Sequence, residues 1–181
     1  MKFKFISLAY IILIGTYAFA DDINFGAGFS LTPEAHFTEF ESRDIKTQTA
    51  LSAAVFYTAD LTDFFNAGIS LGYIYALTSN LDGGWSYPGF NGIDLGAEFS
   101  VGLPLVKFSP RLGGGLYAGW YRYNFTESYF FLPAAEVFPA LELWDNDDYI
   151  KIFLEIPFKY YFHNEASAFF STGIRFKAVY R

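Results

Sequence analysis

The chain contains no cysteine, so disulfide bridges and thiolate metal sites are both excluded. Charged residues are scarce at 17%, and acidic residues outnumber basic ones by 19 to 12. This balance argues against a nucleic-acid partner, which requires a basic surface. After residue 20 no apolar run reaches the roughly 20 residues that a membrane-spanning helix needs. If this part of the chain enters a membrane, it must do so as a closed barrel with every backbone group paired.

Aromatic residues and glycine are abundant instead. The chain has 23 Phe, 14 Tyr and 16 Gly, and 22% of its residues are aromatic. Aromatic side chains favour strands, whereas glycine in strands marks bends and positions of close approach. This combination predicts a closed barrel with tight turns and a crowded interior.

Residues 1–20 have the three parts of a secretory signal peptide. Lys2 and Lys4 precede the apolar run ISLAYIILIG, and Ala18-Phe19-Ala20 forms a small-x-small cleavage site. An uncleaved membrane anchor is the alternative, but the apolar run is short for it. We therefore expect a cleaved signal peptide over 1–20 and one domain over 21–181. That domain has 10 basic and 19 acidic residues, a net charge of −9.

Alternation of apolar and polar or small residues dominates the rest of the chain. The run from Ile93 to Leu103 is the most regular. Eight such runs lie at 23–32, 51–58, 68–78, 93–103, 111–121, 136–143, 150–161 and 168–181. They predict an all-β fold, an eight-stranded antiparallel up-and-down transmembrane β-barrel. Pro139 and Pro157 cannot donate backbone hydrogen bonds, so we expect a bulge or a bend at each.

The connections between these runs alternate in length. Those at 33–46, 79–91 and 124–133 are longer, and those at 59–66, 104–109 and 145–148 are shorter. Outer-membrane barrels have short periplasmic turns and longer external loops. With an even number of strands, both termini are expected on the periplasmic side.

Charge is confined to one of the two rows of each strand. No charged residue lies at the central positions of the apolar row. The opposite row contains Asp94, Glu98, Arg111, Glu136, Glu142, Lys151, Glu155, Lys159, Arg175 and Lys177, and none of these lies on the first three strands. A water-soluble lipocalin would show the reverse arrangement. The apolar row is therefore predicted to face lipid, and the charged row the lumen.

The signs of these charges alternate between neighbouring strands, so we expect a salt-bridge network that plugs part of the lumen. Buried charges are tolerated when they are paired, and Arg175 and Lys177 are expected to face acids such as Glu155. The alternative is a charge-lined selective passage or a proton-linked gate. The narrow bore of eight strands favours the plug.

Six aromatic residues are predicted in the external loops, namely Trp85, Tyr87, Phe90, Tyr129, Phe130 and Phe131. Exposed rings can bind a partner, a ligand or the outer leaflet. We favour the leaflet, since membrane interfaces select aromatic residues at strand ends. Aromatic packing in a soluble sandwich is the alternative.

Two histidines are the main hint of an enzyme. His36 is expected in the first external loop and His163 in the last, where Ser167, Glu165 and Glu34 could complete a hydrolase-like or acyltransferase-like set. No nucleophile elbow accompanies them. We therefore predict no catalytic residue, no metal and no cofactor.

The strand count, the alternation, the loop asymmetry and the terminal stretch AFFSTGIRFKAVYR resemble the small eight-stranded outer-membrane β-barrels of the OmpA, OmpX and OmpW types. The resemblance covers 21–181. It implies recognition of the last strand by the barrel-assembly machinery, although Arg181 follows the expected terminal aromatic, Tyr180. We therefore expect a non-enzymatic monomer in outer-membrane lipid. A small channel or portal for small or apolar compounds is the alternative, and a lipid-modifying barrel enzyme is the third possibility.

Overall fold

The computed structural model describes residues 24–39, 45–62, 65–77, 79–80, 86–87, 89–102, 109–124, 129–146, 149–163 and 168–180. The predicted signal peptide and Trp85 lie outside these ranges. Within them, no helix is both long and apolar enough to cross a membrane.

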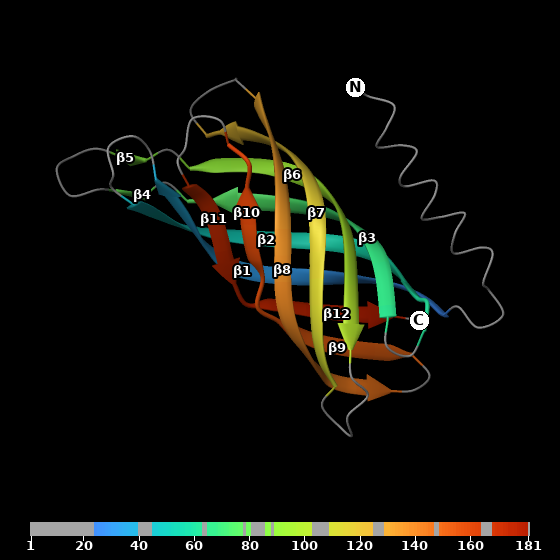
Figure 1. The fold of residues 1–181 in the computed structure, drawn as a ribbon. Coiled ribbons are helices and arrows are strands. Elements are labelled where there is room, and N and C mark those ends of the chain that lie inside the picture. The colour runs from blue at the N-terminus through green and yellow to red at the C-terminus, as the bar shows by residue number, and fades with distance from the viewer. Residues whose placement is uncertain are drawn as a thin grey trace.

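The described chain consists of strands and their connections (Figure 1). Six long strands are β1 (Asn24–Glu39), β2 (Ile45–Asp60), β3 (Phe65–Ala76), β6 (Phe90–Gly102), β7 (Pro110–Tyr123) and β8 (Tyr129–Asn146). Two further wall strands are each divided in two, as β9 (Ile150–Glu155) with β10 (Phe158–Tyr161), and β11 (Ala168–Gly173) with β12 (Arg175–Tyr180). The short strands β4 (Ser79–Asn80) and β5 (Ser86–Tyr87) pair beyond one end of the ring.

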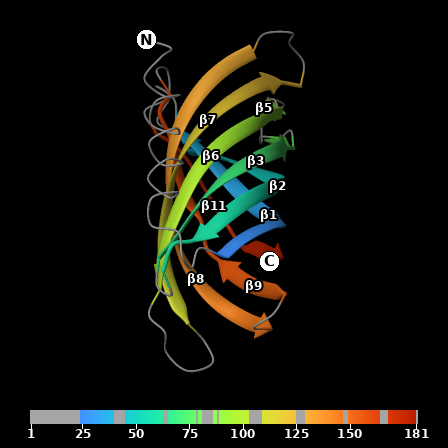
Figure 2. The same ribbon diagram turned by 90° about the vertical axis from the view of Figure 1, so that its right-hand side faces the viewer.

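The wall strands form a closed antiparallel ring, which Figures 1 and 2 show from two sides. Each strand pairs with its neighbour in the sequence, and β1 closes the ring by pairing with β11 and β12. Ala27 lies opposite Tyr180 in this closing pair. The predicted eight-stranded up-and-down barrel is therefore confirmed. We call the end of the barrel near Asn24 and Tyr180 the terminus-side end, and the opposite end the far end.

Three strands are much longer than the alternation predicted. β1 continues to Glu39, where the sequence indicated a loop from residue 33. β2 spans Ile45–Asp60 instead of 51–58, and β8 begins at Tyr129 instead of residue 136. In the added part of β1 the inward row is polar, with His36 and Thr38 buried. Ala35 and Phe37 continue the outward apolar row in this part, but Pro33 interrupts the strand pattern, because proline is disfavoured inside strands.

The two faces of the wall differ in size and polarity. Leu71, Leu95 and Phe99 are each about half exposed on the outward face. Inward positions hold small residues beside large rings, and a Cβ atom at Gly113 would collide with the ring of Phe138. Inward side chains therefore narrow the lumen, as is usual in a small barrel.

Interruptions of the ladder lie side by side on four neighbouring wall strands. Pro157 separates β9 from β10, Ile174 separates β11 from β12, and Pro33 and Pro139 lie at the same level of β1 and β8. Ile156 N–H still donates to the Pro139 carbonyl over 3.0 Å, and Ile174 N–H donates to the Pro33 carbonyl over 3.2 Å. We call this line of four positions the proline seam.

A bulge or a bend was expected at both Pro139 and Pro157, but the strand is interrupted only at Pro157. Pro157 coincides with a strand break, but β8 runs through Pro139 without interruption. The register shift of β8 against β9 lies between Glu142 and Trp144 instead. The carbonyl of Pro139 remains paired, so this residue fits the strand with the loss of a single donor.

Candidate functional site

The ten charged residues singled out in the sequence all lie on the inward face of the wall, and each takes part in an ion pair. Asp94 and Glu98 come from β6, Arg111 from β7, Glu136 and Glu142 from β8, Lys151 and Glu155 from β9, Lys159 from β10, and Arg175 and Lys177 from β12. Six of them are buried, namely Arg111, Glu136, Glu155, Lys159, Arg175 and Lys177. The period of two accounts for their common face.

Arg175 is the centre of the network. Its Nη2 atom lies 2.5 Å from Glu136 Oε1, and its Nη1 atom lies 3.0 Å from Glu155 Oε2. Lys177 Nζ lies 3.0 Å from Glu98 Oε2 and 3.9 Å from Glu155 Oε1. We call these five residues the central ion-pair cluster.

The hydroxyl of Tyr117 links two acids of this cluster. It lies 2.8 Å from Glu98 Oε1 and 3.1 Å from Glu136 Oε1. The Tyr117 ring also lies under Lys159, whose Nζ atom is 3.8 Å from the ring centroid and 2.5 Å from Asp94 Oδ2. A cation over an aromatic face is attracted by the ring quadrupole, so one tyrosine joins the central cluster to the Asp94–Lys159 pair.

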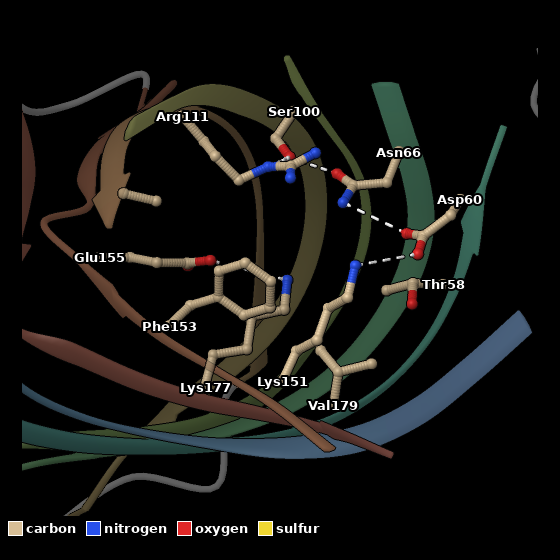
Figure 3. A pocket seen from close by; sticks show the side chains of 11 residues that line it. Thr58, Asp60, Asn66, Ser100, Arg111, Lys151, Phe153, Glu155, Lys177 and Val179 are labelled. Atoms are coloured by element: carbon tan, nitrogen blue, oxygen red, sulfur yellow. Dashed lines mark hydrogen bonds and ion pairs between the residues drawn. The ribbon is translucent and has the colours of Figure 1, made fainter. Parts of the chain in front are cut away.

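A hollow opens between the central cluster and the terminus-side end (Figure 3). It encloses about 390 Å³ including its open mouth, and Arg111, Lys151 and Asp60 line it. Lys151 Nζ lies 3.5 Å from Asp60 Oδ2, and Arg111 Nη1 lies 3.7 Å from Glu142 Oε2. These separations are longer than the 2.5 and 3.0 Å that join Arg175 to Glu136 and Glu155.

Asp60 and Glu34 correct the sequence-based prediction that the first three strands place no charge inside. Asp60 ends β2 and faces Lys151, and Glu34 lies in the added part of β1 beside His36. Both fall beyond the predicted strand ends. Extending the alternation by a few residues would have found them.

The predicted position of His36 in an external loop is wrong. His36 lies in β1 with 0% of its surface exposed, and its ring lies 5.2 Å from Phe90 and 5.9 Å from Phe169. His163 follows β10, and its ring lies 6.3 Å from Phe169. Ser167 and Glu165, the other proposed members of an enzyme-like set, lie outside the described residues.

The predicted external-loop aromatics separate into different environments. Phe90 is 3% exposed in β6, so its placement in an external loop is wrong. Tyr129, Phe130 and Phe131 belong to β8 instead of a loop. Tyr129 and Phe131 point outward, whereas Phe130 stacks on Tyr123 at 4.7 Å. For Tyr87 the structure describes only the backbone, in β5, and Trp85 lies outside the described residues.

Comparisons with known proteins give a likeness of fold alone. No protein-family model matches the chain, and no curated protein sequence matches it. The crystal structure of Neisserial surface protein A, NspA, is similar with a TM-score of 0.68 and 9% identity, covering 88% of this chain and 99% of that chain.

Two other solved barrels are more distant. Ail, the attachment invasion locus protein of Yersinia pestis, has a TM-score of 0.47 and 9% identity, over 86% of this chain and 97% of that chain. The N-terminal β-barrel domain of Pseudomonas aeruginosa OprF has a TM-score of 0.43 and 16% identity, over 83% and 96%. With its closed ring and its likeness to NspA, the chain has the fold of the small outer-membrane β-barrels.

Proposed function

We propose that this protein is a non-enzymatic, monomeric outer-membrane barrel whose lumen is closed by ion pairs. The observation that carries the proposal is the path of the central ion-pair cluster across the bore. Lys177 on β12 pairs with Glu98 on β6. Four steps separate these strands in either direction round the ring of eight, so this ion pair spans the full diameter.

Other ion pairs cross the bore at different heights. Lys159 on β10 reaches Asp94 on β6, and Lys151 on β9 reaches Asp60 on β2, each three strands away round the ring. Water and ions would have to separate these pairs in order to pass. Breaking a buried pair leaves an uncompensated charge in a poorly solvated interior, which costs several kcal/mol.

The outward face supports a location in the outer membrane. Its exposed apolar residues continue round the ring, and aromatic residues such as Trp120, Tyr129 and Trp144 lie at both ends of the strands. Membrane interfaces favour this placement of aromatic rings. In the proposed arrangement residues 1–20 are a cleaved signal, both termini lie in the periplasm, and Tyr129 and Phe131 contact the outer leaflet.

The proposed partners are outer-membrane lipid and the barrel-assembly machinery. β12 is the strand for this recognition, because it ends on Tyr180 and closes the ring against β1.

A small channel is the second candidate function, and the hollow of Figure 3 favours it. The hollow extends from the terminus-side mouth inward to Glu155 and Lys177. The closed part of the lumen is therefore shorter than the wall.

Conductance across planar lipid bilayers separates the two functions. We expect the refolded protein to show no discrete openings in concentrated KCl, and discrete openings would instead favour the channel. A double variant, Glu98→Ser with Lys177→Ser, removes the pair that spans the bore and should conduct more than the native chain. Arg122→Ser is the control, because Arg122 is exposed near the far end of β7.

A further inference from the structure

Five polar side chains gather at the far end of the lumen, away from the central ion-pair cluster. Glu34 and His36 come from β1, Tyr121 from β7, Tyr161 from β10 and Ser171 from β11. We call them the far-end polar cluster. His36 lies opposite Ser171 in the β1–β11 pair, and its ring lies 5.7 Å from that of Tyr161, which lies 6.2 Å from that of Tyr121.

All five residues carry buried polar atoms without a hydrogen-bond partner. These atoms are Oε1 of Glu34, both ring nitrogens of His36, the hydroxyls of Tyr121 and Tyr161, and Oγ of Ser171. Buried polar groups in proteins are nearly always hydrogen-bonded to protein groups or ordered water, or bound to an ion. Six such atoms in one place therefore point to a bound species as their shared partner.

The spacing of Glu34 and His36 fits a metal ion. His36 Nε2 lies 3.5 Å from Glu34 Oε2, which is long for a hydrogen bond between charged groups. Two ligands about 2.0–2.2 Å from one tetrahedral Zn²⁺ ion lie about 3.4 Å apart. The two side chains follow one another at i and i+2 on β1, so both project from the same face of the strand.

We propose that the far-end polar cluster binds one divalent first-row transition metal ion, with Zn²⁺ as the representative, through His36 Nε2 and Glu34. Imidazole and carboxylate are ligands that Zn²⁺ accepts. The described residues contain no group of three or more His, Cys, Asp or Glu suited to a metal. Hydroxyl groups of the cluster or water would therefore complete the coordination.

This inference departs from the expectation of no metal, which placed His36 in an external loop. In the barrel, His36 is enclosed by Phe90, Tyr161 and Phe169. Burial away from bulk water lowers the effective dielectric constant and strengthens the attraction between a carboxylate and a cation. The nearby ammonium of Lys159 is already paired with Asp94 at 2.5 Å.

The test refolds the native chain in detergent with and without ZnCl₂ and measures metal content after dialysis. We expect one zinc ion per chain, and an X-ray absorption spectrum with nitrogen and oxygen ligands that include one imidazole. Native protein that retains no zinc overturns the proposal, as does a spectrum without an imidazole ligand. Refolding in zinc gives the ion access to a buried site.

Matched variants assign the ligands. His36→Gln should lose the ion, and Glu34→Gln should bind it at least about tenfold more weakly. His163→Ala is the control with the second histidine removed, and we expect native zinc content. Loss of zinc in His163→Ala, with retention in His36→Gln, overturns the assignment. If His36→Gln does not fold, the isosteric Glu34→Gln variant and the native absorption spectrum still decide the outcome.

Discussion

Arg175 lies within ion-pair distance of more carboxylates than any other basic side chain described above. Its guanidinium group pairs with Glu136 and Glu155, and it approaches Glu98 at 3.9 Å. The guanidinium offers five donors in a fixed fork, which suits several carboxylates at once. Lysine at this position would present one compact charge and could not hold the same geometry.

Replacing Arg175 with methionine should destabilise the barrel by about 3–5 kcal/mol, because Glu136 and Glu155 would then be buried without their cation. The free energy of unfolding in urea, measured in lipid vesicles, checks this. Adding Glu136→Gln to Arg175→Met should restore part of the loss.

Arg122→Met is the matched control for that prediction. Arg122 is exposed, and its guanidinium lies 5.9 Å from the ring of Tyr129, so its loss should change stability by less than about 1 kcal/mol. Equal losses in the two methionine variants would show that Arg175 acts only as a surface charge.

At the scale of single residues, the sequence indicates which face of the wall a side chain occupies better than which side chain it contacts. The inward position of Glu98 and Lys177 follows from alternation alone. Their contact does not, because the two residues are 79 positions apart and meet only when the ring has closed. His36 was misplaced since Pro33 interrupts the strand pattern before it, although Ala35 and Phe37 continue the outward apolar row.

The proline seam is the main irregularity at the scale of strands. Pro33, Pro139 and Pro157 lie at one level of neighbouring strands, and none of them can donate a backbone hydrogen bond. The wall between β8 and β1 therefore has three fewer donors at this level than a regular ladder would have.

We expect hydrogen exchange to be faster along the seam than at the same depth of the opposite wall. Amides of Ile156 and Ile174 should lose protection before those of Leu71 and Leu95, because local opening starts where the ladder is weakest. Exchange followed by mass spectrometry in lipid nanodiscs measures this. Uniform protection round the ring at this depth would contradict it.

Strand number could be predicted from the sequence, whereas strand ends could not. Each run had enough alternation to indicate one wall strand. At Tyr129 and Glu39, however, the strand extends into polar or wholly aromatic sequence. Pairing with the neighbouring strand maintains these ends, as Glu39 shows opposite Ile45 and Ala168. Such pairing is a tertiary effect, and it holds these ends where the local alternation is interrupted by proline or aromatic runs.

At the scale of the molecule, the outward face should respond to charge according to depth in the bilayer. Leu95 lies near the middle of β6, 52% exposed, and pairs with Leu71 and Ala118. Leu95→Lys should destabilise the barrel by about 2–4 kcal/mol in lipid vesicles.

Tyr129→Lys provides the comparison at the far end of β8, where Tyr129 is 71% exposed. Its expected loss is about 0–1 kcal/mol, because a charge near the interface keeps contact with water. Both losses are measured as free energies of unfolding in urea. Similar losses at the two depths would contradict a bilayer round this face.

The closed ring could be predicted because few folds can accommodate strands with one apolar row and one charged row. The apolar row of each strand has to contact apolar material, either a protein core or lipid. Because the charged rows face one another inside the ring, the interior is not an apolar core, and the apolar rows have to contact lipid. What the alternation could not indicate is how far the lumen is filled, since this depends on how rings such as Tyr117 and Phe138 pack against Gly96 and Gly113.

The crossing ion pairs also restrict how this chain can change during evolution. Glu98 can be replaced at little cost only when Lys177 changes as well, so the lumen should evolve by paired exchange between distant strands. The outward row is free to interchange Leu, Ile, Val and Phe at any position. Relatives should therefore share covarying lumen charges more than overall sequence identity.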